Sequence, residues 1–383
     1  MQNNRPQGLY VHIPFCQSRC IYCDFFSTTS HSMRSRYVDA LCREAYLRSR
    51  QLGNSGRSIR TVYLGGGTPS QLDIAHLDKL FDTLSACFDL LPDAEITMEA
   101  NPDDISDDFL RGLRNLPINR LSFGVQTFSD TRLRFLHRRH TARQAMDTVA
   151  RCQDAGYHNI SIDLMFGFPG ETVEDWEDDV EKAIRMGVQH ISAYALMYEE
   201  GTPLYRMLER GEVEEVDEEV SRGMYETLIR RLKNEGYEHY EISNFAKPGF
   251  ASRHNSAYWE GVPYIGLGAG AHSYDGENRS WNVCALSEYI DGVSQGRRPC
   301  EEEILTPAQK YDEYVMVRLR TVGGVDLQVL KEKFGSALLD YFLRMARPHI
   351  LGGRLKEDNG KVHLSEEGIF VSDDVMSDCM WDE

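Results

Sequence analysis

The stretch "LYVHIPFCQSRCIYCDF", residues 9–25, joins a strand-like run to three closely spaced cysteines. Cys16, Cys20 and Cys23 follow the spacing C-x3-C-x2-C. Three thiolates on one short loop can bind three irons of a four-iron, four-sulfur (4Fe-4S) cluster, which normally takes four thiolates. With three thiolates, one iron keeps an open position for a ligand that is not a cysteine. The stretch therefore predicts a strand that ends in a metal-binding loop.

Two other interpretations of the same loop remain open. A zinc ion would need a fourth ligand, and His12, Asp24 and His31 are the nearby candidates. Structural zinc sites usually take their ligands from two separated pairs, which this loop does not offer. Three thiols that bind no metal are the remaining alternative. The spacing favours the cluster among the three.

The composition bounds the class of protein. A chain of 383 residues predicts one large domain plus a smaller one. The net charge of −18 disfavours nucleic acid as a partner, because an acidic surface repels phosphate. No window approaches roughly eighteen uninterrupted apolar residues, and residues 1–15 do not resemble a signal peptide. Six of the nine cysteines are scattered, which is typical of a reducing compartment, so we expect a cytoplasmic protein.

Strand-like and helical stretches alternate from residue 8 to about 245. Helices are expected at residues 33–50, 141–156 and 171–187, the last with a capping box at Thr172 and Asp175. Alternating strands and helices predict a parallel α/β sheet with right-handed crossovers, either an incomplete barrel or an open twisted sheet. The expected strands lie within residues 8–15, 61–67, 95–101, 120–126, 159–170 and 190–203.

The pattern changes after residue 245. Residues 246–300 are rich in glycine and aromatic side chains and are expected to form a packed connector. Helical patterns follow, and "RLKEDNGKVHL", residues 354–364, predicts a hairpin with its turn at Asn359 and Gly360. Helices plus one hairpin predict a winged-helix-like domain at residues 301–383. Such domains often bind DNA, but the acidic charge favours a structural or partner-docking role here.

Unusual residues occur where the expected strands end. In parallel α/β folds, functional residues gather at the carboxyl ends of the strands. These ends carry the cysteine loop, residues 65–69, Glu99, Gln126 and Asp163. We therefore expect them to face one common space.

Several motifs resemble a known family. "LYVHIPFCQSRCIYCDF" closely resembles the signature loop of radical S-adenosylmethionine (SAM) proteins, and more narrowly of the oxygen-independent coproporphyrinogen III oxidase group. The similarity continues through "YLGGGTPS", "EANPDD", "RLSFGVQTF" and "IDLMFGFPG", in this order, and covers most of the chain. It implies a partial (β/α)6 radical SAM barrel at residues 1–245.

The resemblance also implies roles for individual residues. Cys16, Cys20 and Cys23 would hold the cluster, and its open iron would chelate SAM. Taken alone, most of the polar residues concerned would be ordinary strand-end or surface residues. By resemblance, the residues around the cofactors are Gly66, Gly67 and Thr68, which contact SAM, Glu99 and Gln126, which bond to it, Arg138 and Asp163, which complete the pocket, and Tyr10 and Tyr22, which flank the loop.

Two kinds of protein share this barrel in the family. The oxidase has a longer N-terminal segment and a fourth cysteine in the pattern CxxxCxxCxC. Here only fifteen residues precede Cys16, and Phe25 occupies the place of the fourth cysteine. Both departures match the other branch, the heme chaperones, which resemble the oxidase but bind heme and deliver it to other proteins.

A heme chaperone needs a ligand for the heme iron. "RHNSAYW", residues 253–259, matches the branch's H-N-x-x-Y-W motif, which implies that His254 is this ligand. Tyr258 and Trp259 offer flat apolar surface to a macrocycle. Without the motif, a histidine in such a segment is usually a hydrogen-bonded core residue. His272 in "GAGAHSY" is a second and weaker candidate, because by resemblance it lies where the family approaches SAM.

The sequence thus predicts a heme chaperone that carries a 4Fe-4S cluster and SAM and passes heme to acceptor proteins. The first alternative is a radical SAM oxidoreductase that acts on a tetrapyrrole such as coproporphyrinogen III. The second is a zinc-stabilised scaffold without catalytic activity. Peripheral contact with a membrane and assembly into a homodimer remain open.

Overall fold

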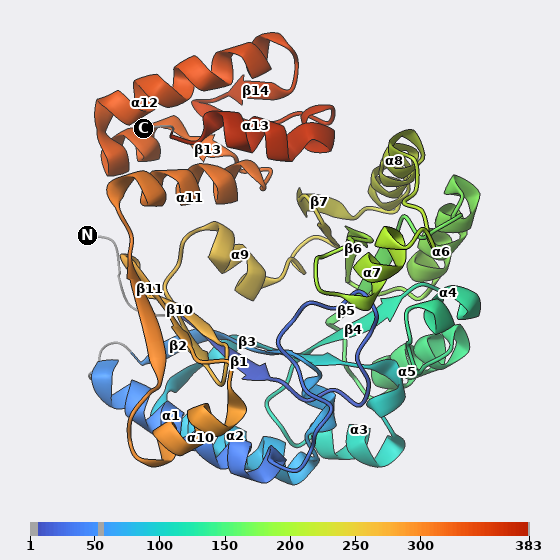
Figure 1. Ribbon diagram of the computed structural model, residues 1–383, viewed down its shortest axis with the longest axis vertical. Coiled ribbons are helices and arrows are strands. Elements are labelled where there is room, and N and C mark those ends of the chain that lie inside the picture. Colours follow the sequence, from blue (N-terminus) through green and yellow to red (C-terminus); the bar gives the residue numbers. More distant parts are fainter. Residues whose placement is uncertain (1–6, 53–56, 382–383) are drawn as a thin grey trace.

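The computed structural model describes residues 7–52 and 57–381. They form one large curved sheet of mixed direction and, beyond it, a smaller C-terminal domain (Figure 1). The strand order in the large sheet is β12-β11-β10-β9-β1-β2-β3-β4-β5-β6-β8-β7. Since this order ends at β12 and β7, the sheet of the described residues is open, as an incomplete barrel requires.

The six expected strands form the centre of this sheet. All five neighbouring pairs among them are parallel and follow the order of the sequence, which confirms the α/β prediction. The strands are β1 (Gly8–Ile13), β2 (Ser58–Gly66), β3 (Asp89–Ala100), β4 (Arg120–Gln126), β5 (Ile160–Phe166) and β6 (His190–Ala195).

Helices cover the outer, convex face of the sheet (Figure 1). The capping box expected at Thr172 is present, with reciprocal hydrogen bonds between Thr172 and Asp175 at the start of α6. Such a cap typically contributes about 1 kcal/mol to helix stability. The covering helices include α1 (Arg34–Leu52), α2 (Ile74–Cys87), α3 (Asp107–Leu113), α5 (Ala142–Asp154), α6 (Val173–Arg185), α8 (Glu218–Asn234) and α10 (Leu286–Ser294).

The strands alternate between apolar and polar residues, and this gives the sheet two different faces. Leu9, Val11 and Ile13 of β1 are fully buried in the core beneath the helices. Tyr10 and His12 point the other way, because successive side chains of a strand leave opposite faces. The same rule places polar or aromatic residues of the neighbouring strands on the inner face: Thr61, Tyr63, Glu95, Thr97, Glu99, Arg120, Ser122, Ser161, Asp163, His190 and Ser192. The concave side is therefore a polar interior and not a second hydrophobic core.

Short strands extend the sheet on both sides. Residues 246–300, expected as a connector, contain strands that continue the sheet beyond β1. Strand β9 is parallel to β1, and the next three strands are antiparallel. The added strands are β9 (Tyr264–Leu267), β10 (His272–Tyr274), β11 (Asn278–Asn282) and β12 (Cys300–Ile304) on one side, and β8 (Asn244–Ala246) and β7 (Glu238–Glu241) on the other.

The C-terminal domain has its own small core. Tyr311, Phe342 and Val362 are fully buried within it. The predicted hairpin is present, and Asn359 and Gly360 have the positive φ values of 50° and 74° that a tight turn of this kind needs. Helices pack on a three-stranded sheet, and α12 is broken by a kink at Gly335. The elements are α11 (Pro307–Leu319), α12 (Leu327–Leu351) and α13 (Ser372–Cys379), with β13 (Val325–Asp326), β14 (Leu355–Asp358) and β15 (Lys361–Leu364). Over the described part of the chain, none of the helices has the length and apolar character that crossing a membrane demands.

Candidate cofactor and heme sites

The cysteine loop leaves the carboxyl end of β1 and is closed at its base by backbone hydrogen bonds. The amide of Cys16 donates to the carbonyl of Thr28 at 2.9 Å, and the amide of Thr28 donates to the carbonyl of Pro14 at 2.7 Å. Cys16 is buried, whereas Cys20 and Cys23 are partly exposed. The loop therefore has a fixed base and presents its thiols at the carboxyl ends of the central parallel strands. We call this side of the sheet its open end.

A small apolar cluster holds the middle of this loop. The amide of Ile21 donates to the carbonyl of Leu136 at 3.3 Å, and the amide of Leu204 donates to the carbonyl of Ile21 at 3.0 Å. Leu204 belongs to α7 (Pro203–Glu209), so the loop is tied to the segments that follow β4 and β6. Ile21 is buried together with Leu136, Met165, Phe168, Leu196 and Leu204.

Two polar groups donate to the cysteine sulfurs. The hydroxyl of Thr68 lies 3.5 Å from Sγ of Cys16, and Nη1 of Arg138 lies 3.6 Å from Sγ of Cys20. Burial raises the pKa of the Cys23 thiol to about 11, so a metal must displace its proton. Hydrogen bonds to cluster sulfurs stabilise their negative charge and tune the reduction potential. This donor set suits a thiolate-bound cluster.

The geometry fits a zinc ion less well. Across residues 7–52 and 57–381, no three His, Cys, Asp or Glu side chains are placed to hold one ion. A cluster does not require this, because each thiolate binds a different iron. His12, a zinc candidate, is also engaged: Nδ1 lies 3.0 Å from the hydroxyl of Tyr10, and Nε2 lies 3.0 Å from the carbonyl of Phe26.

The glycines after β2 let two chain segments approach closely. A Cβ atom on Gly67 would lie 2.7 Å from the carbonyl carbon of Pro14, directly before the cysteine loop. Gly66 has a φ of 105°, which residues with side chains rarely adopt. Its amide donates to Oε2 of Glu99 at 3.2 Å. The segment of residues 66–68 thus lies against the cysteine loop, with little side-chain bulk between them.

Glu99 is half-buried, and among the described residues its carboxyl group forms no ion pair with a cation. Burial raises its pKa to about 7, and the groups that act on it are Tyr63, Asp163 and the Gly66 amide, none of them a cation. The hydroxyl of Tyr63 donates to Oε1 of Glu99 at 2.7 Å. A carboxylate in this state favours a positively charged ligand. SAM carries an ammonium and a sulfonium group, so the site fits this cofactor.

Of the remaining predicted SAM residues, Gln126 and Asp163 lie on neighbouring strands, and Arg138 lies in the loop before α5. Burial raises the pKa of Asp163 on β5 to about 6, even though Arg120 and Arg138 partly oppose the shift. Nη2 of Arg138 donates to Oδ1 of Asn101 at 2.6 Å and to the carbonyl of Gly124. Gln126 has a positive φ of 70° at an irregularity of the β4–β5 pairing, where β4 ends. These residues share the open end of the sheet with the cysteine loop.

His254 lies in a different part of the concave face. Its short helix α9 (Arg253–Trp259) packs near the start of β2 and β3, where Nδ1 lies 2.8 Å from the hydroxyl of Thr61. Oε1 of Glu95 accepts a hydrogen bond from the His254 amide at 3.0 Å. Thr61 and Glu95 precede Gly65 and Glu99 by four residues, or about 13 Å of strand. The two predicted ligand sites are therefore separated along the sheet.

The imidazole of His254 is also fully engaged. Its Nε2 lies 2.9 Å from the hydroxyl of Tyr258, and the ring stacks on Tyr63 with centroids 5.1 Å apart. The residue is only 2% exposed, and burial lowers its pKa to about 3, so the ring is neutral. A neutral imidazole can bind iron, but in this conformation both nitrogens have protein partners.

Sequence reasoning missed the side chains that support these sites. Oδ1 of Asn101 accepts a hydrogen bond from Arg138. Tyr63 contacts both Glu99 and His254. Glu95 accepts a hydrogen bond from the His254 amide. Asn101 follows β3 within "EANPDD", so its position at a strand end was a usable signal. The role of Glu95 had no such signal, because its partner is 159 residues away.

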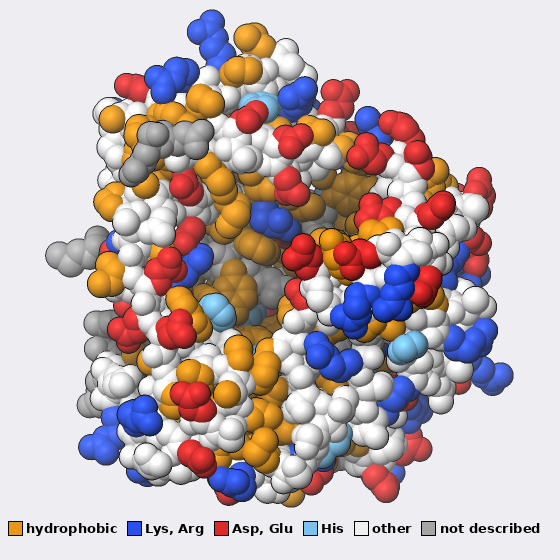
Figure 2. Space-filling view, in the orientation of Figure 1, with side chains coloured by type: hydrophobic (Ala, Val, Ile, Leu, Met, Phe, Trp, Pro, Cys, Tyr) orange, Lys and Arg blue, Asp and Glu red, His pale blue; other side chains and the backbone are white. Residues whose placement is uncertain are grey.

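A hollow lies between the C-terminal domain and strands β10 and β11, where α9 runs in Figure 1. Figure 2 shows that hydrophobic side chains line much of this hollow. A flat apolar macrocycle matches such a lining better than a small polar ligand does.

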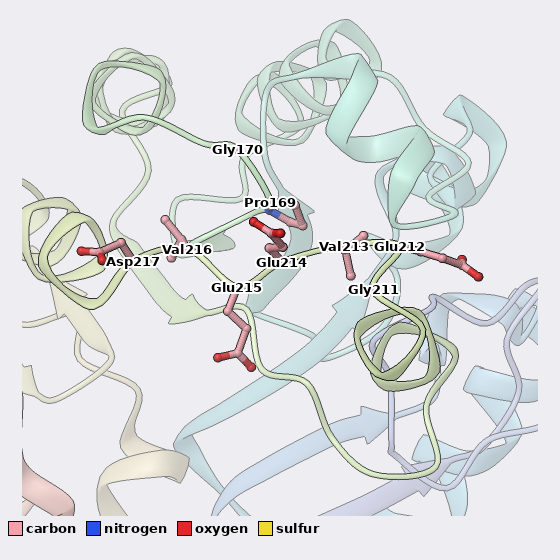
Figure 3. A pocket seen from close by; sticks show the side chains of 9 residues that line it. All are labelled: Pro169, Gly170, Gly211, Glu212, Val213, Glu214, Glu215, Val216 and Asp217. Atoms are coloured by element: carbon pink, nitrogen blue, oxygen red, sulfur yellow. The ribbon is translucent and has the colours of Figure 1, made fainter.

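Two other depressions lie elsewhere on the surface. One, of about 490 Å³, is lined by Pro169, Gly170 and residues 211–217. Figure 3 shows that the side chains of Glu212, Glu215 and Asp217 point in different directions, so they do not converge on a cation. The other, of about 690 Å³, lies beside α5. Neither depression is lined by a predicted site residue.

Comparison with known proteins identifies the family to which the chain belongs. The radical SAM superfamily model matches residues 10–183, and that of the HemN C-terminal domain matches residues 305–371. The heme chaperone HemW of Bacillus subtilis is 34% identical over 96% of this chain and 98% of its own length. The heme chaperone HemW of Lactococcus lactis is 33% identical over 99% and 98%.

A solved structure shows the same fold. Coproporphyrinogen III oxidase (HemN) from Escherichia coli, a radical SAM enzyme, superposes with a TM-score of 0.85 at 23% identity. The match covers 98% of this chain and 90% of the oxidase. Sequence and structure agree, and the chain therefore belongs to the radical SAM superfamily and, within it, to the family of the heme chaperone HemW proteins.

Proposed function

We propose that this protein is a heme chaperone that binds heme and passes it to acceptor proteins, while it carries a 4Fe-4S cluster and SAM. The observation that carries the proposal is the similarity to HemW proteins over almost the whole chain, at 34% identity. The three-cysteine loop supports it, because Phe25, which is 65% exposed, stands where the oxidase has a fourth cysteine.

The chain's own residues would hold the two cofactors at the open end of the sheet. Cys16, Cys20 and Cys23 would bind the cluster, which supplies an open iron and one-electron chemistry when it is present. Thr68 and Arg138 would donate to the sulfurs, as they already do to the thiols. The second set would surround SAM: Tyr10, Tyr22, Gly66, Gly67, Thr68, Glu99, Gln126, Arg138 and Asp163.

His254 would coordinate the heme iron. Its neutral ring suits iron, but the hydroxyl of Tyr258 must first leave Nε2, 2.9 Å away. Heme binding at this residue therefore requires a movement of α9 or of the Tyr258 side chain. We place the cofactor site within residues 1–245, the heme motif within 246–300 and a partner-docking domain at 301–383.

A cytoplasmic location completes the proposal. All nine cysteines are free thiols, which is the usual state in a reducing compartment. Heme-binding proteins are the expected partners, and a homodimer or contact with a membrane surface would be compatible with this role.

One experiment separates the chaperone from an oxidoreductase. The full-length protein is reconstituted anaerobically with iron and sulfide, and ferric heme is titrated into it while absorbance is recorded. We expect saturable heme binding and no conversion of coproporphyrinogen III with SAM and a reductant. Efficient formation of protoporphyrinogen would overturn the proposal in favour of the oxidoreductase, whose fold this chain shares. Zinc in place of iron and labile sulfide would exclude the cluster.

A further inference from the structure

A solvent-exposed histidine, His272, lies on the same concave face as the buried His254. Of the twelve histidines, His137, His158 and His272 are exposed. His272 belongs to β10, and its neighbour two residues on, Tyr274, pairs with Tyr264 of β9. Through β9 and β1 this row continues to Thr61, so His272 faces the concave side. Within the described residues its ring forms no side-chain hydrogen bond, unlike that of His254.

The neighbouring strand holds this imidazole in a defined plane. His272 pairs with Trp281 of β11, and their rings stack with centroids 5.6 Å apart and an interplanar angle of 24°. An imidazole that binds heme iron stands across the macrocycle and points one nitrogen at the metal. The stacked indole would keep the ring upright in this orientation, and its edge would contact the porphyrin.

The same face offers a cation and aromatic surface. Arg279 lies two residues before Trp281 on β11, pairs with Tyr274 and is 43% exposed. It forms an ion pair with Glu313 of α11 at 3.0 Å, and a propionate of heme would share this cation. Glu301 and Glu303 of β12 lie opposite Trp281 and Arg279. Their charge directs the macrocycle away from β12, toward Tyr264 and Tyr274.

We propose that heme first docks on this face, with His272 as the iron ligand, and only then reaches His254. The inference rests on the proposed function and deepens it. In the transfer, the bond between iron and His272 breaks, the bond to His254 forms, and the oxidation state of iron does not change. The order follows from burial, since His272 is open to the solvent and His254 must first lose its contact with Tyr258. A carrier gains from such an arrangement because the outer site can exchange heme without opening the interior.

Rapid mixing tests the order. The full-length, cluster-loaded protein is mixed anaerobically with ferric heme, and heme absorbance is followed for wild type, His272→Ala, His254→Ala and the control His158→Ala. Wild type and control should show a fast and a slow phase. His272→Ala should slow the fast phase by about tenfold or more, equivalent to about 1.4 kcal/mol. His254→Ala should keep the fast phase and lose the slow one.

Chemical rescue separates a ligand from a merely structural residue. In His272→Gly, added imidazole should restore the fast phase and the spectrum of a histidine-bound heme, whereas His158→Gly should not respond. Unchanged kinetics in His272→Ala would overturn the docking site, even if His254→Ala then loses heme as the proposed function requires. If wild type binds no heme, the proposed function itself fails.

Discussion

The open end of the sheet and the region around α9 differ in the partners of their titratable groups. At the open end, none of the described groups that act on the pKa of the half-buried Glu99 is a cation, and the pKa of the Cys23 thiol is raised to about 11. Around α9, both nitrogens of His254 and its amide have protein partners. The first region holds acidic groups that favour a cation or a metal, and the second is a hydrogen-bonded core. The thiols of Cys20 and Cys23 are already partly exposed, whereas heme binding at His254 requires a rearrangement.

The largest expected effect comes from the open end. Cys16→Ala should abolish cluster assembly, because two remaining thiolates leave two irons without protein ligands. Iron and labile sulfide measured after anaerobic reconstitution check this. Cys300→Ala, which removes a thiol on β12 outside the loop, is the matched control and should assemble the cluster normally. Equal iron content in the two variants would show that the loop does not hold the cluster.

A second variant tests how firmly the loop is held. Ile21→Ala should destabilise the packing of the cysteine loop by about 2–4 kcal/mol, because it leaves a cavity among buried apolar side chains. The expected result is faster loss of the cluster in the presence of a chelator, followed by absorbance. Phe25→Ala removes an exposed side chain from the same loop and should leave this rate unchanged. Similar rates for both variants would contradict the anchoring role of Ile21.

The raised pKa of Glu99 predicts that SAM affinity and stability depend on pH. Burial raises the pKa of Glu99 from 4.5 to about 7, so its charged form is disfavoured in the ligand-free fold. The ligand-free protein should therefore lose stability as pH rises from about 4.5 to 7, and affinity for the cationic SAM should rise over the upper part of this range.

Calorimetric titration of SAM at pH 6 and pH 8 checks this expectation. In wild type, affinity should increase by about tenfold between the two values, as expected for a group that titrates near 7. Glu99→Gln should bind SAM more weakly and lose most of the increase. A pH profile that is unchanged in this variant would rule out Glu99 as the group responsible.

The smallest expected effect concerns the region around α9. Tyr258→Phe removes the hydroxyl that lies 2.9 Å from Nε2 of His254 and keeps the ring. A net hydrogen bond contributes about 0.5–1.5 kcal/mol, so the slow phase of heme binding should accelerate about twofold to tenfold. Tyr46→Phe, on α1 and outside every proposed site, is the control. A slower phase in Tyr258→Phe would mean that the hydroxyl assists heme binding.

Local patterns predicted much of the central fold. The capping box at Thr172 and the turn at Asn359 and Gly360 are present because they depend on neighbours a few residues apart. The six parallel strands follow from runs of alternating residues. Strands β9 to β12 were not predicted, since each has only three to five residues and their pairing partners come from distant parts of the chain.

The sequence by itself determined the cysteine loop, the parallel pairing of the central strands and the gathering of polar residues at the open end. These follow from short-range spacing and from the rule that parallel strands end on one side. Only the tertiary structure decided which histidine is closed and which is open. His254 is covered by Thr61, Tyr63 and Tyr258, whereas His272 is stacked on Trp281 and faces solvent. Burial and the occupation of ring nitrogens depend on contacts between distant segments, which spacing along the chain does not encode.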